Sequence, residues 1–322
     1  MAGINRRYFF LGSFAVALSC SRVAQSSRPR VSRVSVLRVP SYSVDLAAIV
    51  RRILIEHQVN VAGKKILLKP NLVEFSPHAP INTHPVFVGA VREAFHALGA
   101  SDVRIAEGPG HRRMTLDMAS AAGYFSNVPK FEKVFRDLNL DQVSEVRLNR
   151  PFSTLSRLYL PHTVLDCDLL VSLPKMKTHH WTGATLSMKN LFGVVPGNVY
   201  GWPKNPLHWA GIDECIADLH YLFPRQFCIV DGIEGMEGNG PILGTRKMAG
   251  VIAAGSHPPS VDATCCRIMQ IDPQKIGYLK LVERRSQWNS DAIQQIAESI
   301  SSVETSFALI PDLEHLLLRA RP

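Results

Sequence analysis

The sequence predicts an α/β protein with mainly parallel sheets, flanking helices and two lobes around a cleft. Strand-like and helix-like segments alternate along most of the chain, which is typical of βαβ units. The length of 322 residues exceeds what one small core needs and suits two lobes. We therefore expect an export signal and linker at residues 1–30, a first α/β lobe at 31–165 and a second α/β lobe at 166–322.

The first predicted lobe begins with three strands separated by helices. Alternating or short apolar runs predict strands at residues 31–39, 65–69 and 102–106. Apolar residues at helical spacing predict a helix within residues 44–59. Thr83 is the expected N-cap of a second helix, since Pro85 lies in its first turn and Gly99 near its end.

The alternation resumes after a less regular stretch. Within residues 125–165 we expect a helix around residues 131–138 and an edge hairpin. Beyond them, apolar runs predict strands at residues 168–173, 227–230 and 248–254. Helices are expected at residues 213–222 and 260–269 and in the C-terminal stretch that carries Ile293, Ile296 and Ile300.

The positive charge is concentrated at the N-terminus. The chain has 36 Lys and Arg against 27 Asp and Glu, a net charge of +9. Residues 1–40 hold seven arginines and no acidic residue, so 9 − 7 leaves +2 for the remaining 282 residues. No basic stripe with interleaved aromatics is found, and a nucleic-acid partner is therefore not expected.

The N-terminal residues indicate targeting. Arg6 and Arg7 precede a short apolar run that ends at Cys20, a pattern that resembles a twin-arginine signal with a lipoprotein cleavage box. This predicts recognition by the twin-arginine export machinery, a periplasmic or cell-envelope location, and a membrane anchor if Cys20 is acylated. An acid-free start rich in Arg and Ser also fits an organelle-targeting peptide, and Cys20 then has no special role.

The six cysteines show no CxxC spacing, so neither a zinc ribbon nor an iron–sulfur cluster is expected. Most of those beyond the leader lie in apolar runs, where a free thiol behaves as a small hydrophobe. We expect reduced core thiols and no disulfide framework.

A segment dense in cationic and imidazole groups follows the strand at residues 168–173. Residues 175–208 form a loop-rich segment with four lysines, adjacent histidines and several glycines. Open α/β sheets bind ligands at the carboxyl ends of their strands, so this density predicts a site. Its candidate anion-binding lysines are Lys175, Lys177 and Lys189, and its candidate histidines are His179, His180 and His208.

Three other strand ends carry candidate groups. Lys69 ends a strand just before a helix N-terminus, a combination that favours an anion but also fits a solvated lysine. His111 lies in a glycine-rich loop after the third strand and could exchange protons. Residues 231–241 form an acidic, glycine-rich loop without EF-hand spacing, and Asp262 is expected to interact with the N-terminal dipole of its own helix.

Several of these motifs together resemble the family called domain of unknown function 362. They are KPNLV at residues 69–73, THP at 83–85, DLLVSLPKMKTHHWTGATLSMKNLFGVVPG at 168–197, DGIEGMEGNGP at 231–241 and SVDAT at 260–264. Some members of that family carry ferredoxin-like iron–sulfur segments, and this chain lacks the cysteines for them.

The order of Gly-His-Arg, Lys-Thr-His, Ser-x-Lys and a later His is also similar to the nickel-pincer lactate racemase family. That resemblance implies a 2-hydroxy-acid substrate and a nickel-containing pyridinium nucleotide. It implies that His111 and His179 are an acid/base pair, Lys189 the cofactor lysine and His208 the metal ligand. Lys69 stands where that family has an Arg- and Asp-bearing substrate loop, and no second half of matching length follows.

Two hypotheses of function remain open from the sequence. In the first, the protein is an enzyme that binds a small anionic, 2-hydroxy-acid-like substrate, with histidine acid/base groups and a metal-containing cofactor. In the second, it is a non-catalytic periplasmic lipoprotein that captures an anion or a metal complex. Both require that the candidate lysines and histidines converge in one place.

Overall fold

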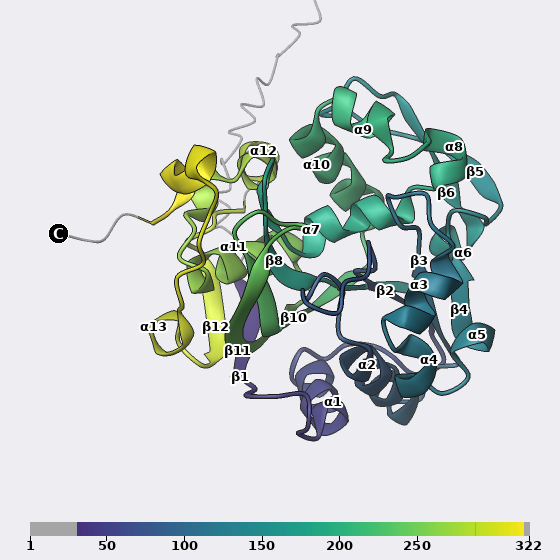
Figure 1. Cartoon of the computed structure of the whole chain (residues 1–322), viewed down its shortest axis with the longest axis horizontal. Coiled ribbons are helices and arrows are strands. Elements are labelled where there is room, and N and C mark those ends of the chain that lie inside the picture. The colour runs from purple at the N-terminus through teal and green to yellow at the C-terminus, as the bar shows by residue number, and fades with distance from the viewer. Residues whose placement is uncertain (1–30, 287, 319–322) are drawn as a thin grey trace, which may run out of the picture.

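A ten-stranded, mainly parallel sheet forms the centre of the computed structural model, which describes residues 31–286 and 288–318 (Figure 1). Arg6, Arg7 and Cys20 lie outside the described residues. The main path of the sheet runs in the order β12 (Ile293–Ala297), β1 (Ser32–Arg38), β11 (Thr245–Gly255), β10 (Gln226–Glu237), β7 (Leu169–Leu173), β2 (Lys65–Pro70), β3 (Asp102–Glu107) and β4 (Phe135–Asp137). Two short strands extend it beside β10, namely β8 (Lys175–His179) and β9 (Gly183–Thr185). The predicted α/β class with a mainly parallel sheet is confirmed.

Helices cover both faces of the sheet. One core contains side chains of α1 (Leu46–Glu56), α2 (Pro85–Ala97), α3 (Thr115–Ala121), α4 (Tyr124–Asn127) and α5 (Phe131–Val134). The other contains side chains of α6 (His162–Leu165), α7 (Ser187–Asn190), α9 (Asn205–Trp209), α10 (Ile212–Leu222), α11 (Pro258–Ile268), α12 (Gly277–Arg285) and α13 (Ile300–Val303). The remaining elements are α8 (Gly197–Tyr200), the predicted edge hairpin of β5 (Val143–Arg147) and β6 (Arg157–Pro161), and three short 3₁₀ turns.

The two cores follow from the alternation of side chains along each strand. On β2, Ile66 and Leu68 pack into the core with α1 and α2, while Leu67 packs into the opposite core. Successive side chains of a strand point to opposite faces, so a continuous apolar run is what a strand buried on both faces requires.

Strands from both predicted lobes share this sheet. β2, from residues 31–165, pairs in parallel with β7, from residues 166–322. β2 also pairs in parallel with β3. The carboxyl ends of these three strands therefore lie at one edge, which is the edge that carries the candidate groups.

Three of the predicted elements are wrong. Ile293 and Ile296 lie on β12, which pairs in parallel with β1, rather than on a helix. The glycine-rich acidic segment is not a loop, because β10 continues to Glu237 in antiparallel register with β11. The helix expected at residues 131–138 ends after one turn and gives way to β4, which extends the sheet beside β3.

The N-terminus of α2 also differs from the prediction. The N-cap is His84, whose side chain accepts a hydrogen bond from the backbone N–H of Val86. The Oγ1 of Thr83 instead donates to the carbonyl oxygen of Leu173 at 2.6 Å and accepts from the N–H of Asn71 at 2.8 Å. Thr83 therefore connects the ends of β2 and β7 at the edge where the strands terminate.

The part of the chain described in the structure contains no helix long and apolar enough to cross a bilayer. Its five cysteines are all free thiols, four of them buried and Cys167 half-buried. Burial raises the pKa of the Cys215 thiol to about 11, which keeps it protonated.

Candidate functional site

A cavity of about 630 Å³ opens at the carboxyl ends of β2, β3 and β8. Its volume lies in the usual range for sites that bind small molecules, roughly 300–1,000 Å³. The wall combines cationic, imidazole and apolar side chains. Its members include Lys69, Asn71, Leu72, Glu107, His111, Lys177, His179, His180, Trp181, Thr185, Lys189, Asn190, Phe192, Lys204, His208, Ile242 and Leu243.

The structure brings together most of the candidate residues of the sequence. Those that line the cavity are Lys69, His111, Lys177, His179, Lys189 and His208, together with His180. They come from the end of β2, the loop after β3, strand β8 and the segment that follows β8. Residues more than a hundred positions apart thus share one wall, because parallel strands end at a common edge.

Lys175 does not line the cavity. Its Nζ lies 2.6 Å from Oδ2 of Asp231 and donates to the hydroxyl of Tyr42 at 2.9 Å. Both charged side chains are almost completely buried. The expectation that Lys175 binds a ligand is therefore corrected, since its ammonium is neutralised and hydrogen-bonded inside the protein.

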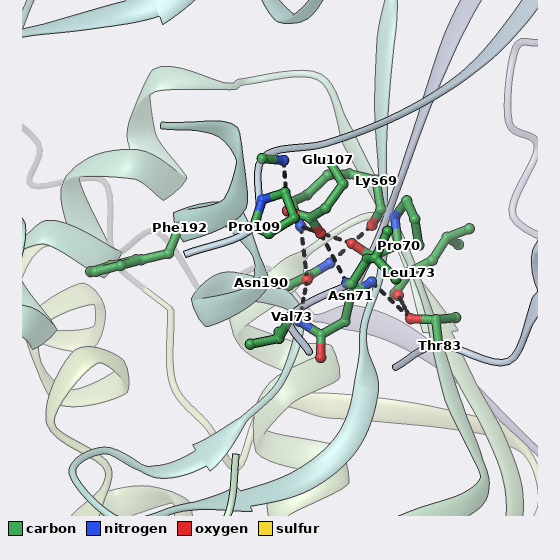
Figure 2. Close-up of polar contacts among 12 residues, drawn as sticks. Lys69, Pro70, Asn71, Val73, Thr83, Glu107, Pro109, Leu173, Asn190 and Phe192 are labelled. Atoms are coloured by element: carbon green, nitrogen blue, oxygen red, sulfur yellow. Dashed lines mark hydrogen bonds and ion pairs between the residues drawn. The ribbon is translucent and has the colours of Figure 1, made fainter. Parts of the chain in front are cut away.

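A buried polar network forms one wall of the cavity (Figure 2). The Nζ of Lys69 donates to Oε2 of Glu107, to the carbonyl oxygen of Pro70 at 2.8 Å and to Oδ1 of Asn190 at 3.1 Å. The side-chain amide of Asn190 donates in turn to the carbonyl oxygen of Lys69 at 2.9 Å. Leu72 donates its backbone N–H to Oε2 of Glu107 at 3.2 Å. This network ties together the ends of β2 and β3 and helix α7.

Three further lysines line the cavity without a carboxylate partner in the described residues. The Nζ of Lys177 donates to backbone carbonyls of Ile81 and Pro241, at 2.8 and 3.2 Å. The Nζ of Lys204 donates to backbone carbonyls of Gly108 and Phe192, at 2.6 and 3.0 Å. The ammonium of Lys189 lies 3.7 Å from the centre of the Phe192 ring. Glu107 is the one carboxylate among the lining residues, and Lys69 already neutralises it.

Burial shifts these lysines toward the neutral amine. It lowers the pKa of Lys189 to about 7, assisted by the positive charge of Lys69 and opposed by Asp213. It also lowers the pKa of Lys204 to about 7, although Glu107 opposes the shift. The pKa of Lys177 falls well below its usual value for the same reason, with Lys175 and Lys189 adding to the effect. A bound anion would oppose this shift, because its negative charge stabilises the protonated form of each lysine.

Hydrogen bonds assign different proton positions to the histidines. The Nδ1 of His179 accepts from the backbone N–H groups of Trp181 and Thr182, at 3.1 and 3.4 Å. The neutral ring of His179 therefore carries its proton on Nε2. His180 and His208 have the opposite arrangement, with the proton on Nδ1. The Nδ1 of His180 donates to the carbonyl oxygen of Gly240 at 2.7 Å, and the Nδ1 of His208 donates to the carbonyl oxygen of Lys204 at 3.1 Å. Nε2 of each is left with a free lone pair.

The lowered pKa values of His179 and His208 agree with neutral imidazole rings. Burial first, and the positive charge of Lys189 second, hold the pKa of His179 well below its usual value. The pKa of His208 is lowered by the same two causes. Neutral imidazoles of this kind can accept protons or ligate a metal ion through a free lone pair.

Helix α7 is held in place by Asp262 of α11. The carboxylate of Asp262 accepts from the backbone N–H groups of Ser187 and Met188, at 2.7 and 3.0 Å. Asp262 does not lie in the first turn of its own helix as expected, because α11 begins four residues earlier, at Pro258. Since α7 carries Lys189 and Asn190, the carboxylate of Asp262 determines where both side chains meet the cavity.

Two buried polar atoms of the cavity wall have no hydrogen-bond partner among the described residues. They are Oδ1 of Asn71 and Oγ1 of Thr185, on side chains that are 6% and 4% exposed. Buried polar atoms are normally paired, so these two are available to a ligand. No group of three His, Cys, Asp or Glu side chains able to hold a metal ion is found in residues 31–286 and 288–318.

The sequence hypotheses missed several residues of the site. Lys204 lies within the predicted segment at residues 175–208, but a lysine beside Pro203 carries no distinguishing signal. Asn190 follows Lys189 directly, and its role depends on the distant Lys69. Glu107 stands at the end of a predicted strand, as Lys69 does. That shared position at neighbouring strand ends was the sequence signal that could have identified Glu107 as a residue of the site.

Comparisons with known proteins agree with the resemblance in the motifs. The family model described as domain of unknown function (DUF362) matches residues 66–267. The thylakoid-associated protein sll1697 of Synechocystis sp. is 28% identical over 271 residues, which cover 79% of each protein.

A solved structure, that of the lactate racemase apoprotein from Thermoanaerobacterium thermosaccharolyticum, is 18% identical with a TM-score of 0.43. The match covers 74% of this chain and 57% of that structure, so the chain spans little more than half the length of that protein. The family model, by contrast, matches more than half of this chain. The chain therefore belongs to the DUF362 family.

Proposed function

We propose that the cavity binds a small organic anion, such as a 2-hydroxy acid, and that its imidazoles move a proton to or from the bound molecule. The observation that carries this proposal is the charge of the wall. Lys177, Lys189 and Lys204 line the cavity without carboxylate partners in the described residues. An anion stabilises such ammonium groups, and the apolar side chains beside them suit an organic molecule.

The hydrogen-bond pattern suggests a role for each imidazole. His180 has a free lone pair on Nε2 and would accept a proton from the ligand, with His111, in the loop after β3, as the second candidate base. His179, whose Nδ1 accepts backbone hydrogen bonds, would instead donate its Nε2 proton in a hydrogen bond. We therefore replace the acid/base role expected for His179 from the family resemblance by that of a hydrogen-bond donor.

The wall also has groups that fit a metal-containing nucleotide cofactor. A metal ion carried by an organic group needs few protein ligands, and Nε2 of His208 has a free lone pair that can serve as one. Lys177, Lys189 and Lys204 could hold a phosphate. The hydroxyl of Thr185, which has no partner within residues 31–286 and 288–318, could donate to it. Such a cofactor would supply an acceptor for hydride.

Calorimetric titration with lactate, glycolate and inorganic phosphate tests the binding step. Loss of an ammonium group that contacts the anion should weaken binding by about 10- to 100-fold, the worth of one charge-assisted hydrogen bond. Lys177→Met and Lys204→Met should both show this loss. Lys65→Met, at an exposed lysine of β2, is the matched control and should bind as the wild type does. Equal affinities in all four proteins would refute the proposal.

A second experiment separates catalysis from capture. Protein purified from its own host is analysed by mass spectrometry, intact and then denatured, and is assayed for inversion of lactate at C2. Catalysis predicts that His180→Gln abolishes inversion and retains binding, while His78→Gln, at an exposed histidine, changes neither. Lactate that binds but never inverts, even in the holoprotein, would favour a non-catalytic protein that captures an anion or metal complex.

We also propose that residues 1–30 direct the chain out of the cytoplasm by the twin-arginine route and that Cys20 is acylated. The paired arginines support this, and the relative named as thylakoid-associated supports a link with a membrane. Fractionation of cells should find the protein in the envelope, and replacement of Arg6 and Arg7 by Lys should retain it inside. Cys20→Ser should release it from the membrane fraction. Delivery to an organelle instead would support the alternative signal.

A further inference from the structure

We propose that Lys189 is a carbonyl-reactive amine, which forms an imine with a small 2-oxo acid bound in the cavity. This inference rests on the proposed function, because the cavity must first bind the carboxylate group of that acid. The imine adds a covalent step to anion binding and identifies 2-oxo acids as the substrate class.

The environment of Lys189 distinguishes it from the other lysines of the cavity. The ammonium groups of Lys69, Lys177 and Lys204 all donate to protein oxygens. No oxygen in the described residues accepts a hydrogen bond from Nζ of Lys189, which lies against the ring of Phe192. Burial, the lack of oxygen acceptors in the described residues and the nearby charge of Lys69 favour the neutral amine, while the face of the Phe192 ring offsets only part of this by attracting the ammonium. The neutral amine is the nucleophilic form.

The side chain is also accessible and positioned. Lys189 is half-buried and lines the cavity, so a bound molecule can reach its Nζ. The carboxylate of Asp262 binds the first turn of α7 and fixes the backbone from which Lys189 projects. A pKa lowered to about 7 brings the unprotonated amine within reach at neutral pH.

The surrounding groups match a 2-oxo acid better than a neutral aldehyde. The carboxylate would be held by Lys177 or Lys204, whose positive charge has no carboxylate partner in the described residues. Oγ1 of Thr185 has no hydrogen-bond partner in the described part of the chain and could donate to the carbonyl oxygen of the bound acid. A neutral aldehyde would use none of this charge.

The step balances without an oxidant or reductant. The lone pair of Nζ attacks the carbonyl carbon, a C–N bond forms, and the π electrons move to oxygen. One proton passes from nitrogen to that oxygen and gives a carbinolamine. The carbinolamine nitrogen then forms a double bond to carbon and gives up its remaining proton, the C–O bond breaks, and the oxygen leaves as water.

Reductive trapping tests the inference. The wild-type protein is incubated with pyruvate and sodium cyanoborohydride, digested, and mapped by mass spectrometry. We expect the reduced adduct at Lys189 at least tenfold above that at any other lysine. Excess lactate, an anion without a carbonyl, should protect Lys189. Lys189→Arg should remove the adduct, and Lys65→Arg, at an exposed lysine, should leave it unchanged.

The outcomes separate this inference from the proposed function. Adducts spread evenly over exposed lysines, or no adduct while calorimetry shows that pyruvate binds, would overturn the imine and leave anion binding intact. If neither pyruvate nor lactate binds the wild-type protein, both proposals fall together. The decisive measurement uses the wild-type chain, so it does not depend on how well a variant folds.

Discussion

Lys69 and Glu107 form an ion pair that joins the ends of two adjacent parallel strands within the wall of the cavity. Their side chains are 1% and 2% exposed. Burial lowers the pKa of Lys69, and the charge of Glu107 opposes that shift. Because the two charges of this pair cancel, any net positive charge of the cavity comes from its other lysines.

Removing one member of this pair should destabilise the protein more than removing both. Lys69→Met leaves a buried carboxylate without a counter-charge, at a cost of about 3 to 5 kcal/mol. Glu107→Leu should cost a similar amount by leaving the ammonium uncompensated. Urea unfolding of both variants and of Lys69→Met with Glu107→Leu measures the coupling. Costs that simply add in the double variant would contradict a direct interaction.

Gly193→Ala should disturb the same pair. A Cβ at Gly193 would overlap the Oε1 of Glu107 and the Nζ of Lys69. Gly110→Ala is a matched control in the cavity wall, because a Cβ there meets nothing within 4 Å. We expect Gly193→Ala to lose about 2 kcal/mol or more in urea unfolding, as overpacking does, and Gly110→Ala to change little. Similar stabilities of the two variants would contradict this placement of Gly193.

Asp262→Ala should destabilise the protein and impair the cavity. It leaves two buried N–H groups of α7 without acceptors, each worth about 1–3 kcal/mol. Asp312→Ala, at an exposed aspartate, is the control. Urea unfolding gives the stability, and lactate titration of the folded protein should show weaker binding only for Asp262→Ala. Unchanged affinity in that variant would mean that α7 keeps its position without the carboxylate.

Anion binding should weaken as the pH rises through 7. Lys189 and Lys204 have pKa values of about 7, so both lose their positive charge between pH 6 and 8. Lactate stays ionised over this range, and its Kd should rise by about tenfold for each lysine that contacts it. Calorimetry at several pH values gives the slope. Lys189→Arg should reduce it, because a guanidinium keeps its charge, and a flat wild-type profile would contradict the prediction.

Substitutions of Lys175 and Lys177 should have different effects on stability and on lactate binding, although the two residues lie only two positions apart on β8. Lys175→Met breaks the buried pair with Asp231 and should lower the free energy of unfolding by about 3 kcal/mol, with lactate affinity retained in the folded protein. Lys177→Met should weaken lactate binding. Unfolding and titration of both variants test the contrast. A loss of affinity in Lys175→Met equal to that in Lys177→Met would contradict it.

Local patterns predicted much of the sheet and its helices. β2 and β7 follow from short apolar runs, because a strand between two helical layers must be apolar on both faces, and β1 follows from its alternation of apolar and polar residues. The same reasoning failed for residues 293–297, whose isoleucines fit one face of a helix. Pairing with β1 made that segment a strand, and such pairing is not encoded in local spacing.

The sequence by itself determined which chemistry the protein carries: lysines and histidines at strand ends, in motifs of the DUF362 family. Only the tertiary structure decided which of them share a wall. It paired Lys175 with Asp231, brought Lys204 to the cavity and set the proton positions of His179 and His180. The physical reason is that the ionisation and orientation of a side chain depend on desolvation and on partners distant in sequence.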